Sequence, residues 1–277
     1  MDFEKISQWY DRQDVKFEIT KQLYNREFAL LVPSWCDSEI KKRSTRMLKC
    51  HNTQGFDFIL KALDFKKKQT PYNFYYSLAK YYGGIPNQTL NFIERKKSQA
   101  NEEWKDLHEY HMKQFDLLID IDSGSHEDID FAYLSTQNII TLLDDCNTPY
   151  ILRFSGKGFH IIIPSMYMPK KSRNTFDDDS IYMLHSRIAR KLHDTFSEMI
   201  DLSIYDSRRL CKLSYSLANY KENTYVCYPF NTKQEFNDFK LNDYNLNNFD
   251  KPIIMRGHFI FNQTGMTDEL IKRLGVM

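Results

Sequence analysis

FDLLIDID, at residues 115–122, is the stretch that decides the fold, because a bulky apolar run ends there in two carboxylates. Its length and branched side chains predict a short buried strand. Side chains alternate along a strand, so Asp120 and Asp122 share one face and the isoleucines that precede them share the other. Two neighbouring carboxylates repel each other unless a cation lies between them, and Mg²⁺ prefers oxygen ligands. The stretch therefore indicates a metal site on one face of a strand.

A second stretch, RFSGKGFHIIIP at residues 153–164, supplies groups that a metal-bound triphosphate needs. Ser155 has a hydroxyl, Lys157 has a positive charge, and His160 enters the following apolar run. The two glycines let the backbone approach phosphate oxygens. A carboxylate pair followed by such an anion-binding loop indicates phosphoryl or nucleotidyl transfer.

Each of these stretches also has a plainer interpretation. Asp-x-Asp also occurs at solvated strand ends, and Ser-Gly-Lys-Gly between strands is an ordinary hairpin turn with a surface lysine. A calcium loop is excluded, because the spacing D-x-[DN]-x-[DN]-G is absent and Phe131 stands where the last glutamate would fall. A Walker A loop is excluded too, because G-x-x-x-x-G-K-[ST] is unmatched and a strand is expected to follow.

IDLSIYDSRRLCKLSYSL, at residues 200–217, is the third element in this order. Asp201 would add a third carboxylate, and Asp206 is a competing candidate for that place. The basic residues that follow within a dozen positions, and that would neutralise phosphates, are Arg208, Arg209 and Lys212. The plainer interpretation is a strand end followed by a solvated basic turn.

Taken together, the ordered motifs hhhDhD, S-G-K-G-x-H and hD-x-x-hY…R-L-x-K-L-x-x-S-L resemble the catalytic core of the archaeo-eukaryotic primase superfamily. That group includes primase small subunits, primase-polymerases and the polymerase domain of bacterial ligase D. NREFAL at residues 25–30 is similar to the R-E-F segment of primase small subunits, and PYNFYYSLAKYY at residues 71–82 suits the same region. The resemblance spans roughly residues 20–220, most of the chain.

The resemblance implies an α/β (α+β) fold of the archaeo-eukaryotic primase type, with residues 1–277 as a single primase-polymerase catalytic domain. An N-terminal, mostly helical α/β module at residues 1–114 would pack on a sheet like that of an RNA-recognition motif at residues 115–277. The second of these modules would carry the active site.

The resemblance also assigns roles by position. The catalytic, metal-binding residues would be Asp120, Asp122 and Asp201, where Asp201 is preferred to Asp206 because its spacing to the later basic residues matches the family pattern. The residues that would contact the nucleotide's phosphates or support that contact are Ser155, Lys157, His160, Arg209 and Lys212. The cofactor would be two Mg²⁺ or Mn²⁺ ions.

Two departures from the family pattern concern zinc and the third motif. Primase small subunits usually carry a Cys/His zinc module, and no such spacing occurs among Cys36, Cys50, Cys146, Cys211 and Cys227. We therefore expect no structural zinc. Ala218 occupies the place where a histidine commonly follows Ser-Leu. Both departures favour a plasmid, viral or repair-type member.

Composition limits the cellular setting and the mode of binding. The polar start MDFEKISQWY and the lack of a long apolar run predict an intracellular, cytoplasmic protein with no membrane partner. The two departures from the family pattern favour a prokaryotic, plasmid or viral replication context. Lys and Arg number 38 against 37 Asp and Glu, so nucleic acid would bind through local basic patches rather than through a global field. Such patches occur at residues 41–46, 66–68 and 95–97, although each also suits a solvated helix end or loop.

Apolar periodicity predicts the remaining elements. The expected helices lie at residues 6–24, 71–82, 94–112, 128–144, 180–198 and 267–274, the last of them capped at Gly275. REFALLV, from Arg26 onward, is strand-like, and residues 257–261 would form a closing strand. Residues 230–251 are rich in Asn, Asp and Lys with few branched apolar side chains, which predicts a long surface excursion.

These observations predict a template-dependent nucleotidyltransferase, a DNA primase or primase-polymerase that uses NTPs or dNTPs and a single-stranded DNA template in replication or repair. A primase large subunit or a helicase would be a further partner. The alternatives are a metal-dependent nuclease that uses the same three aspartates, and a non-catalytic nucleic-acid-binding replication subunit. The sequence leaves open the choice of sugar, and it leaves open initiation of new strands against extension of existing ones.

Overall fold

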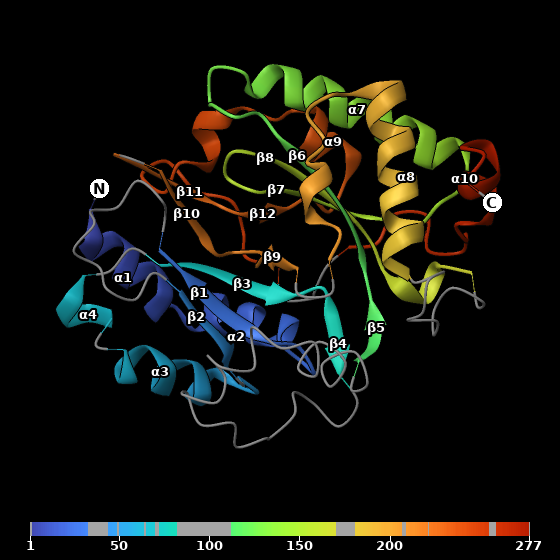
Figure 1. Cartoon of the computed structure of the whole chain (residues 1–277). Coiled ribbons are helices and arrows are strands. Elements are labelled where there is room, and N and C mark those ends of the chain that lie inside the picture. The colour runs from blue at the N-terminus through green and yellow to red at the C-terminus, as the bar shows by residue number, and fades with distance from the viewer. Residues whose placement is uncertain are drawn as a thin grey trace.

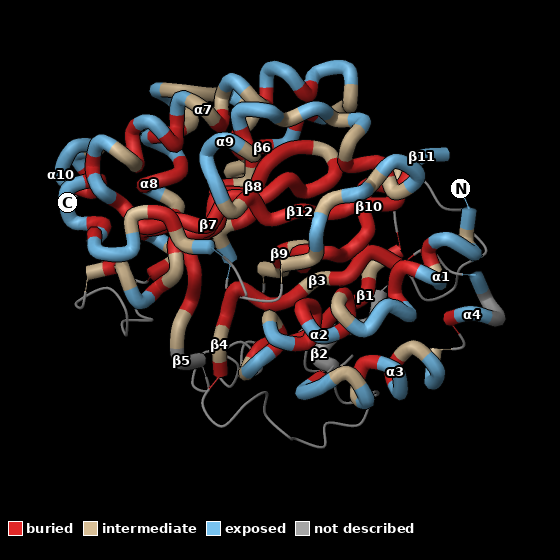
Figure 2. The backbone as a smooth tube through the Cα atoms, turned by 180° about the vertical axis from the view of Figure 1, so that it is seen from behind, coloured by how far each residue is buried: buried red, intermediate tan, exposed pale blue. Residues whose placement is uncertain are grey.

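The computed structural model describes residues 2–32, 44–48, 50–63, 65–69, 72–81, 112–169, 181–206, 209–220, 222–254 and 259–276. Within them the chain is a mixed α/β structure with several antiparallel sheets. In Figure 1 the N-terminal elements, in blue, fill the lower part, and most later elements, from green to red, fill the upper part, while β5 (Met112–Phe115) runs down beside β4 (Ala79–Tyr81) at the lower right. The strands form the buried interior, and the outward sides of the helices are exposed (Figure 2).

One four-stranded sheet joins the N-terminal region to a much later strand. Its order is β2 (Ser44–Leu48), β1 (Phe28–Leu31), β3 (Asn73–Ser77) and β9 (Leu210–Lys212), with antiparallel neighbours. In the last pair, Cys211 lies opposite Tyr76, and Lys212 lies opposite Tyr75. The third sequence element therefore completes the sheet of the N-terminal region, where Cys211 is buried and Lys212 is partly buried.

The second four-stranded sheet contains the other two sequence elements. Its order is β12 (Tyr228–Pro229), β7 (Ile151–Phe154), β8 (Gly158–Ile163) and β6 (Leu117–Asp122), again with antiparallel neighbours. Beyond β6, Ile200 forms an isolated antiparallel bridge with Ile121. Helix α7 (Ile129–Asp145) contacts β6 and β8, and α8 (Ile181–Phe196) contacts β6. Both helices match the predictions for residues 128–144 and 180–198.

The remaining described elements are shorter. The helices are α1 (Phe3–Asp11), α2 (Gln13–Gln22), α3 (Thr53–Ala62), α4 (Phe65–Lys68), α9 (Lys233–Asn237) and α10 (Asp268–Arg273). The 3₁₀ turns are η1 (Ser165–Tyr167), η3 (Leu202–Ile204) and η4 (Leu241–Tyr244), and the two-stranded sheets are β4 (Ala79–Tyr81) with β5 (Met112–Phe115) and β10 (Leu217–Tyr220) with β11 (Asn223–Val226).

Several terminal predictions agree with these bounds. The helix expected at residues 6–24 is present as α1 and α2, which Arg12 separates because its backbone is extended. The REFALLV strand is present as β1. At the C-terminus, α10 ends before Gly275, whose φ of +62° is the left-handed conformation of a glycine cap.

The prediction of a helix at residues 71–82 is wrong, because the structure has strands β3 and β4 there. Phe74 and Tyr76 alternate with partly exposed Tyr75 and are nearly completely buried. Aromatic side chains favour strands when a neighbouring strand supplies backbone partners, and β1 pairs with β3 along its length. Pairing with β1, a strand distant in the sequence, therefore makes residues 73–77 a strand rather than a helix.

The prediction of a surface excursion at residues 230–251 is also wrong. Phe230, Phe236 and Tyr244 are fully buried in the hydrophobic core. The Tyr244 ring lies 5.2 Å from that of Phe154, centroid to centroid. Aromatic side chains bury large areas one at a time, so a segment with few branched residues can still contribute to a core.

Two predictions fall largely outside the described residues. Of the charged helix expected at residues 94–112, the structure describes Met112 alone, as the first residue of β5. Of the closing strand expected at residues 257–261, it describes the end, where Phe261 bridges Tyr150. None of the helices it describes is long and apolar enough to span a membrane. The helical N-terminal module and the sheet like that of an RNA-recognition motif stay predictions.

Candidate active site

The pairing around β6 sets the positions of the three predicted metal ligands. Because Ile121 bridges Ile200, Asp120 and Asp201 are neighbours across the same backbone pairing, and the Asp201 N–H donates to the Asp120 carbonyl at 2.9 Å. Asp122 lies two residues from Asp120 in the same strand and so shares its face of the sheet. The chain therefore brings an aspartate from a distant segment beside the strand that carries the other two.

Local hydrogen bonds hold two of these carboxylates. Oδ1 of Asp201 accepts from the Ser203 N–H at 2.8 Å and from the Ser203 hydroxyl at 2.6 Å, which caps η3. Oδ1 of Asp122 accepts from the Gly124 N–H at 2.9 Å. In the described part of the chain, no group of three or more His, Cys, Asp or Glu side chains is arranged as a metal-binding set. The metal-binding role of the three aspartates stays a prediction.

The hairpin of β7 and β8 places the predicted phosphate-binding residues beside the same strand. In the register of β8 with β6, His160 lies opposite Asp120, and Nε2 of His160 is 3.4 Å from Oδ1 of Asp120. Nζ of Lys157 is 3.2 Å from Oδ1 of Asp122. One carboxylate thus faces a buried imidazole, and the next faces a lysine at the turn.

The two glycines of this hairpin have structural reasons of their own. Gly156 has a φ of +97°, a left-handed conformation that other residues rarely adopt. A Cβ on Gly158 would lie 1.9 Å from the Ile121 carbonyl oxygen, so another residue there would push β8 away from β6. The glycines therefore let the turn lie directly against the strand of the aspartates.

Asp120 and His160 influence each other's ionisation. Burial alone would raise the pKa of Asp120, but the charges of His160, Lys212 and Arg209 lower it below its usual value. Burial alone would lower the pKa of His160, but Cys211 and Asp120 raise it to about 9. At neutral pH the pair is therefore a carboxylate and an imidazolium, which leaves a positive charge on β8 beside a negative charge on β6.

The basic residues of the third motif lie in different surroundings. Nζ of Lys212 donates to the Ser155 carbonyl at 2.8 Å, so this side chain reaches the hairpin turn as predicted for a supporting residue. Arg209 donates to the carbonyls of Ile204 and Ser203, both at 2.9 Å, and lies 3.5 Å from exposed Asp206. Arg208 lies outside the described residues.

Two residues that the motifs did not single out also contact this group. Sγ of Cys211 lies 3.4 Å from Nδ1 of His160. Arg153 donates to the Lys212 carbonyl at 2.6 Å and to the Tyr76 hydroxyl at 2.8 Å. The one signal in the sequence was an arginine within the apolar strand YILRF, since charged residues are rarely buried without a reason.

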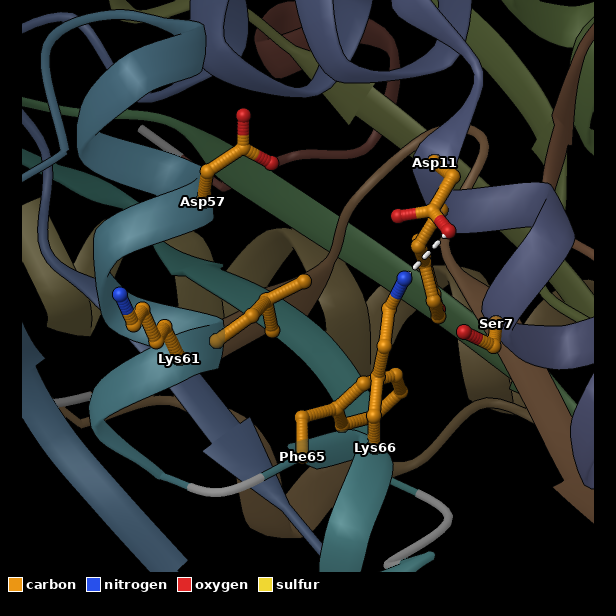
Figure 3. Close-up of a pocket in the computed structure, with 8 residues that line it drawn as sticks. Ser7, Asp11, Asp57, Lys61, Phe65 and Lys66 are labelled. Atoms are coloured by element: carbon orange, nitrogen blue, oxygen red, sulfur yellow. Dashed lines mark hydrogen bonds and ion pairs between the residues drawn. The ribbon is translucent and has the colours of Figure 1, made fainter.

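A separate pocket of about 380 Å³ lies between α1, α3 and α4 (Figure 3). Among its charged side chains, Lys66 pairs with Asp11 at 2.6 Å, and Asp57 pairs with Lys16 at 2.7 Å. The pocket shares no residue with the group around Asp120, and Lys66 of the predicted basic patch at residues 66–68 lines it.

Comparisons with known proteins find similarity in structure. No family model matches the chain, and no curated protein shows significant sequence similarity to it. The polymerase domain of ligase D from Mycobacterium tuberculosis, solved with DNA, aligns over 97% of this chain and 90% of its own, with 12% identity and a TM-score of 0.49. The catalytic domain of the primase Repb′, solved with initiator DNA, aligns over 73% and 77%, with 11% identity and a TM-score of 0.32.

The likeness to these two solved domains, at 11–12% identity, is one of fold alone.

Proposed function

We propose that the chain is a template-dependent nucleotidyltransferase, a DNA primase or primase-polymerase, that joins nucleotides from NTPs or dNTPs. The observation that supports this proposal is a row of residues across one sheet. The register places Arg153 opposite His160, His160 opposite Asp120, and Asp120 beside Asp201. Two positive groups thus adjoin two negative ones, which is the distribution that a metal-bound triphosphate requires.

The donor set suits hard divalent ions. Asp120, Asp122 and Asp201 offer carboxylate oxygens, and Mg²⁺ and Mn²⁺ prefer such ligands. When bound, two such ions activate the attacking hydroxyl and neutralise the charge of the leaving pyrophosphate. We propose these three residues as the ligands, with Asp201 rather than Asp206 because Asp201 alone of the two adjoins Asp120 through the backbone.

The cationic side of the row would bind the triphosphate. The His160 imidazolium lies at the boundary between the two halves of the row and would donate to a phosphate oxygen. The Lys157 side chain is 33% exposed, so it can leave Asp122 for a phosphate once a metal ion occupies that carboxylate. Lys212 and the Ser155 segment that it contacts would form the remaining wall of the phosphate site.

Base pairing with a single-stranded DNA template would select the nucleotide, which leaves the protein to position the strands. A primase large subunit or a helicase remains a proposed partner. A metal-dependent nuclease would use the same aspartates, but it has less need of the cations of the hairpin. A non-catalytic binding subunit would not need clustered carboxylates beside a phosphate backbone, since those carboxylates repel it.

The test is incubation of the purified protein with single-stranded DNA, labelled nucleotides and Mg²⁺ or Mn²⁺, with and without a primer. We expect labelled product that requires the template and the metal and that a chelator stops without unfolding the protein, since no structural zinc is proposed. Degradation of the DNA without added nucleotides would instead support the nuclease. Binding of DNA without either reaction would support the non-catalytic subunit.

A further inference from the structure

Arg153 occupies an unusual electrostatic position in this site. It lies on β7, two residues before Ser155, and is 0% exposed. It stands opposite His160 in the register of β7 with β8, so both side chains share the face of the sheet that carries Asp120. Arg153 is therefore the innermost positive group of the row described above.

The side chain makes hydrogen bonds to neutral acceptors. Its two terminal nitrogens donate to the Lys212 carbonyl and to the Tyr76 hydroxyl, and its buried Nε has no hydrogen-bond partner. No carboxylate of the described residues lies within ion-pair distance of Arg153. Arginine keeps its proton in proteins, so the positive charge is buried without a carboxylate to balance it.

The positive charge of Arg153 acts on the pKa values of two neighbouring thiols. Burial would raise the pKa of Cys211, but His160 and Arg153 lower it. Burial raises the pKa of Cys227 to about 11, so this second thiol near Arg153 is neutral at physiological pH. The ionisable groups that act most strongly on Arg153 are thus Tyr76, Cys211 and Cys227, none of which is a carboxylate. Burying an unbalanced charge is costly, and a fold keeps one most readily where a ligand supplies the opposite charge.

We propose that Arg153 is a positioning residue for the anionic part of the substrate. It holds Lys212 in place and supplies a buried positive charge beneath the phosphate site. This inference rests on the proposed function. The Arg153–Lys212 bond fixes the backbone of β9, and Nζ of Lys212 in turn contacts the Ser155 carbonyl. Arg153 thereby sets the distance between the hairpin turn and β9, the two walls of the phosphate site.

Arg26 provides a matched control within the same chain. It is a second buried arginine that contacts the Tyr76 ring, with its guanidinium carbon 5.0 Å from the ring centroid, against 5.5 Å for Arg153. Unlike Arg153, it forms an ion pair, with Asp116. If Arg153 were simply a structural arginine, loss of its charge should harm folding as loss of Arg26 does.

The test compares Arg153→Met, which removes the charge at similar length, with Arg153→Lys, which keeps the charge. Binding of ATP and dATP is measured by calorimetry, the KM and kcat of incorporation by steady-state assay, and single-stranded DNA affinity and thermal unfolding in parallel. For Arg153→Met we expect Kd and KM for the nucleotide to rise about tenfold, with DNA affinity unchanged and a melting temperature that falls far less than in Arg26→Met. Arg153→Lys should recover part of the nucleotide affinity.

Nucleotide affinity equal to wild type in Arg153→Met would overturn the inference. So would a parallel loss of melting temperature, DNA affinity and nucleotide affinity that Arg153→Lys does not recover, because that pattern marks a structural residue. If the wild-type protein binds neither nucleotide, the proposed function fails, and the inference fails with it. If the wild type binds and the Met variant matches it, the inference alone fails.

Discussion

Two buried arginines contact the ring of Tyr76, and the regions around them differ in how charge is balanced. Around Arg26 the network is closed: its guanidinium pairs with Asp116 and donates to the carbonyls of Ser77 at 2.8 Å and Leu78 at 2.7 Å. Oδ1 of Asp116 also accepts from the Ser165 N–H at 3.0 Å. Around Arg153, by contrast, the acceptors are a carbonyl and a hydroxyl.

The difference separates a structural role from a functional one. Burial would raise the pKa of Asp116, but Arg26 lowers it, so both partners are charged and neutralise each other. That pair ties the segment before β1 to the segment between β5 and β6. Arg153 lies on the face of the sheet that carries Asp120, and no carboxylate of the described residues forms an ion pair with it. The charges of Arg26 and Asp116 neutralise each other without a ligand, whereas the charge of Arg153 is available to a negatively charged ligand.

The largest expected effect concerns the carboxylates of the candidate site. Asp122→Ala and Asp201→Ala should each lower nucleotide incorporation by about a thousandfold or more, because metal-assisted charge stabilisation contributes several kcal/mol. The measurement is incorporation of labelled nucleotide on a template, with circular dichroism to show an intact fold. Asp206→Ala is the control, since Asp206 is exposed and lies near Arg209. If Asp206→Ala removes activity and Asp201→Ala does not, Asp206 is the third ligand.

The second effect tests the closed region. Arg26→Met leaves Asp116 buried without its partner and should lower the free energy of unfolding by about 3–5 kcal/mol. Arg153→Met should cost far less, because no buried carboxylate is left behind. Denaturant unfolding of both variants gives the comparison. Equal losses in the two variants would remove the distinction between the regions.

The third effect concerns the cations at the hairpin. His160→Ala and Lys157→Ala should each weaken triphosphate binding by roughly 1.5–3 kcal/mol, the usual value of a hydrogen bond to a charged group. Affinity for single-stranded DNA should hardly change. Calorimetric titration with nucleotide and fluorescence titration with DNA measure the two affinities. Normal nucleotide binding with loss of DNA binding would reassign the loop to the nucleic-acid strand.

The smallest effect is the pH dependence of stability. Each of the two regions contains a histidine whose pKa is shifted in the folded protein. His185, buried near Asp116, has a pKa lowered to about 3 by burial, so protonation favours the unfolded chain. Stability should therefore fall as pH drops below about 6.5, by at most about 1.4 kcal/mol per pH unit. His185→Leu should flatten this acid limb in denaturant unfolding at a series of pH values, and a slope unchanged from wild type would contradict the account.

His160 should show the opposite sign in the same experiment without metal. Its folded pKa is raised to about 9, so its contribution to stability is complete below about 6.5 and disappears as pH rises through about 9. The difference in unfolding free energy between wild type and His160→Ala should shrink over that interval. A difference that stays constant to pH 10 would show that the imidazolium is absent from the folded protein.

Local patterns predicted the elements whose signals lie within one segment. The run that ends at Asp122, the Ser-Gly-Lys-Gly turn and the helices α7 and α8 follow from alternation, turn chemistry and helical spacing. The strands at residues 73–81 did not follow, because pairing of β3 with β1 and β9 and of β4 with β5 decides their structure. The burial of Phe236 and Tyr244 was not predicted, because a segment with few branched apolar residues was expected to lie at the surface. The large area that aromatic side chains bury was not considered.

The candidate site was predictable to a similar degree. Alternation placed Asp120 and Asp122 on one face from the sequence alone, but the position of Asp201 beside them depends on a bridge between segments about eighty residues apart. Arg153 and Cys211 were missed because β9 brings Cys211 and Lys212 over the hairpin, and no local pattern encodes that contact.

The most direct test of the account is template-dependent incorporation by wild type and by Asp120→Asn, measured side by side with Mn²⁺ on primed and unprimed single-stranded DNA. Asparagine keeps the size of the side chain and removes the charge next to His160. The account predicts labelled product with wild type and none with the variant, while circular dichroism shows that both proteins are folded. Full incorporation by Asp120→Asn would contradict it, and so would the absence of any product from folded wild-type protein that binds both nucleotide and template.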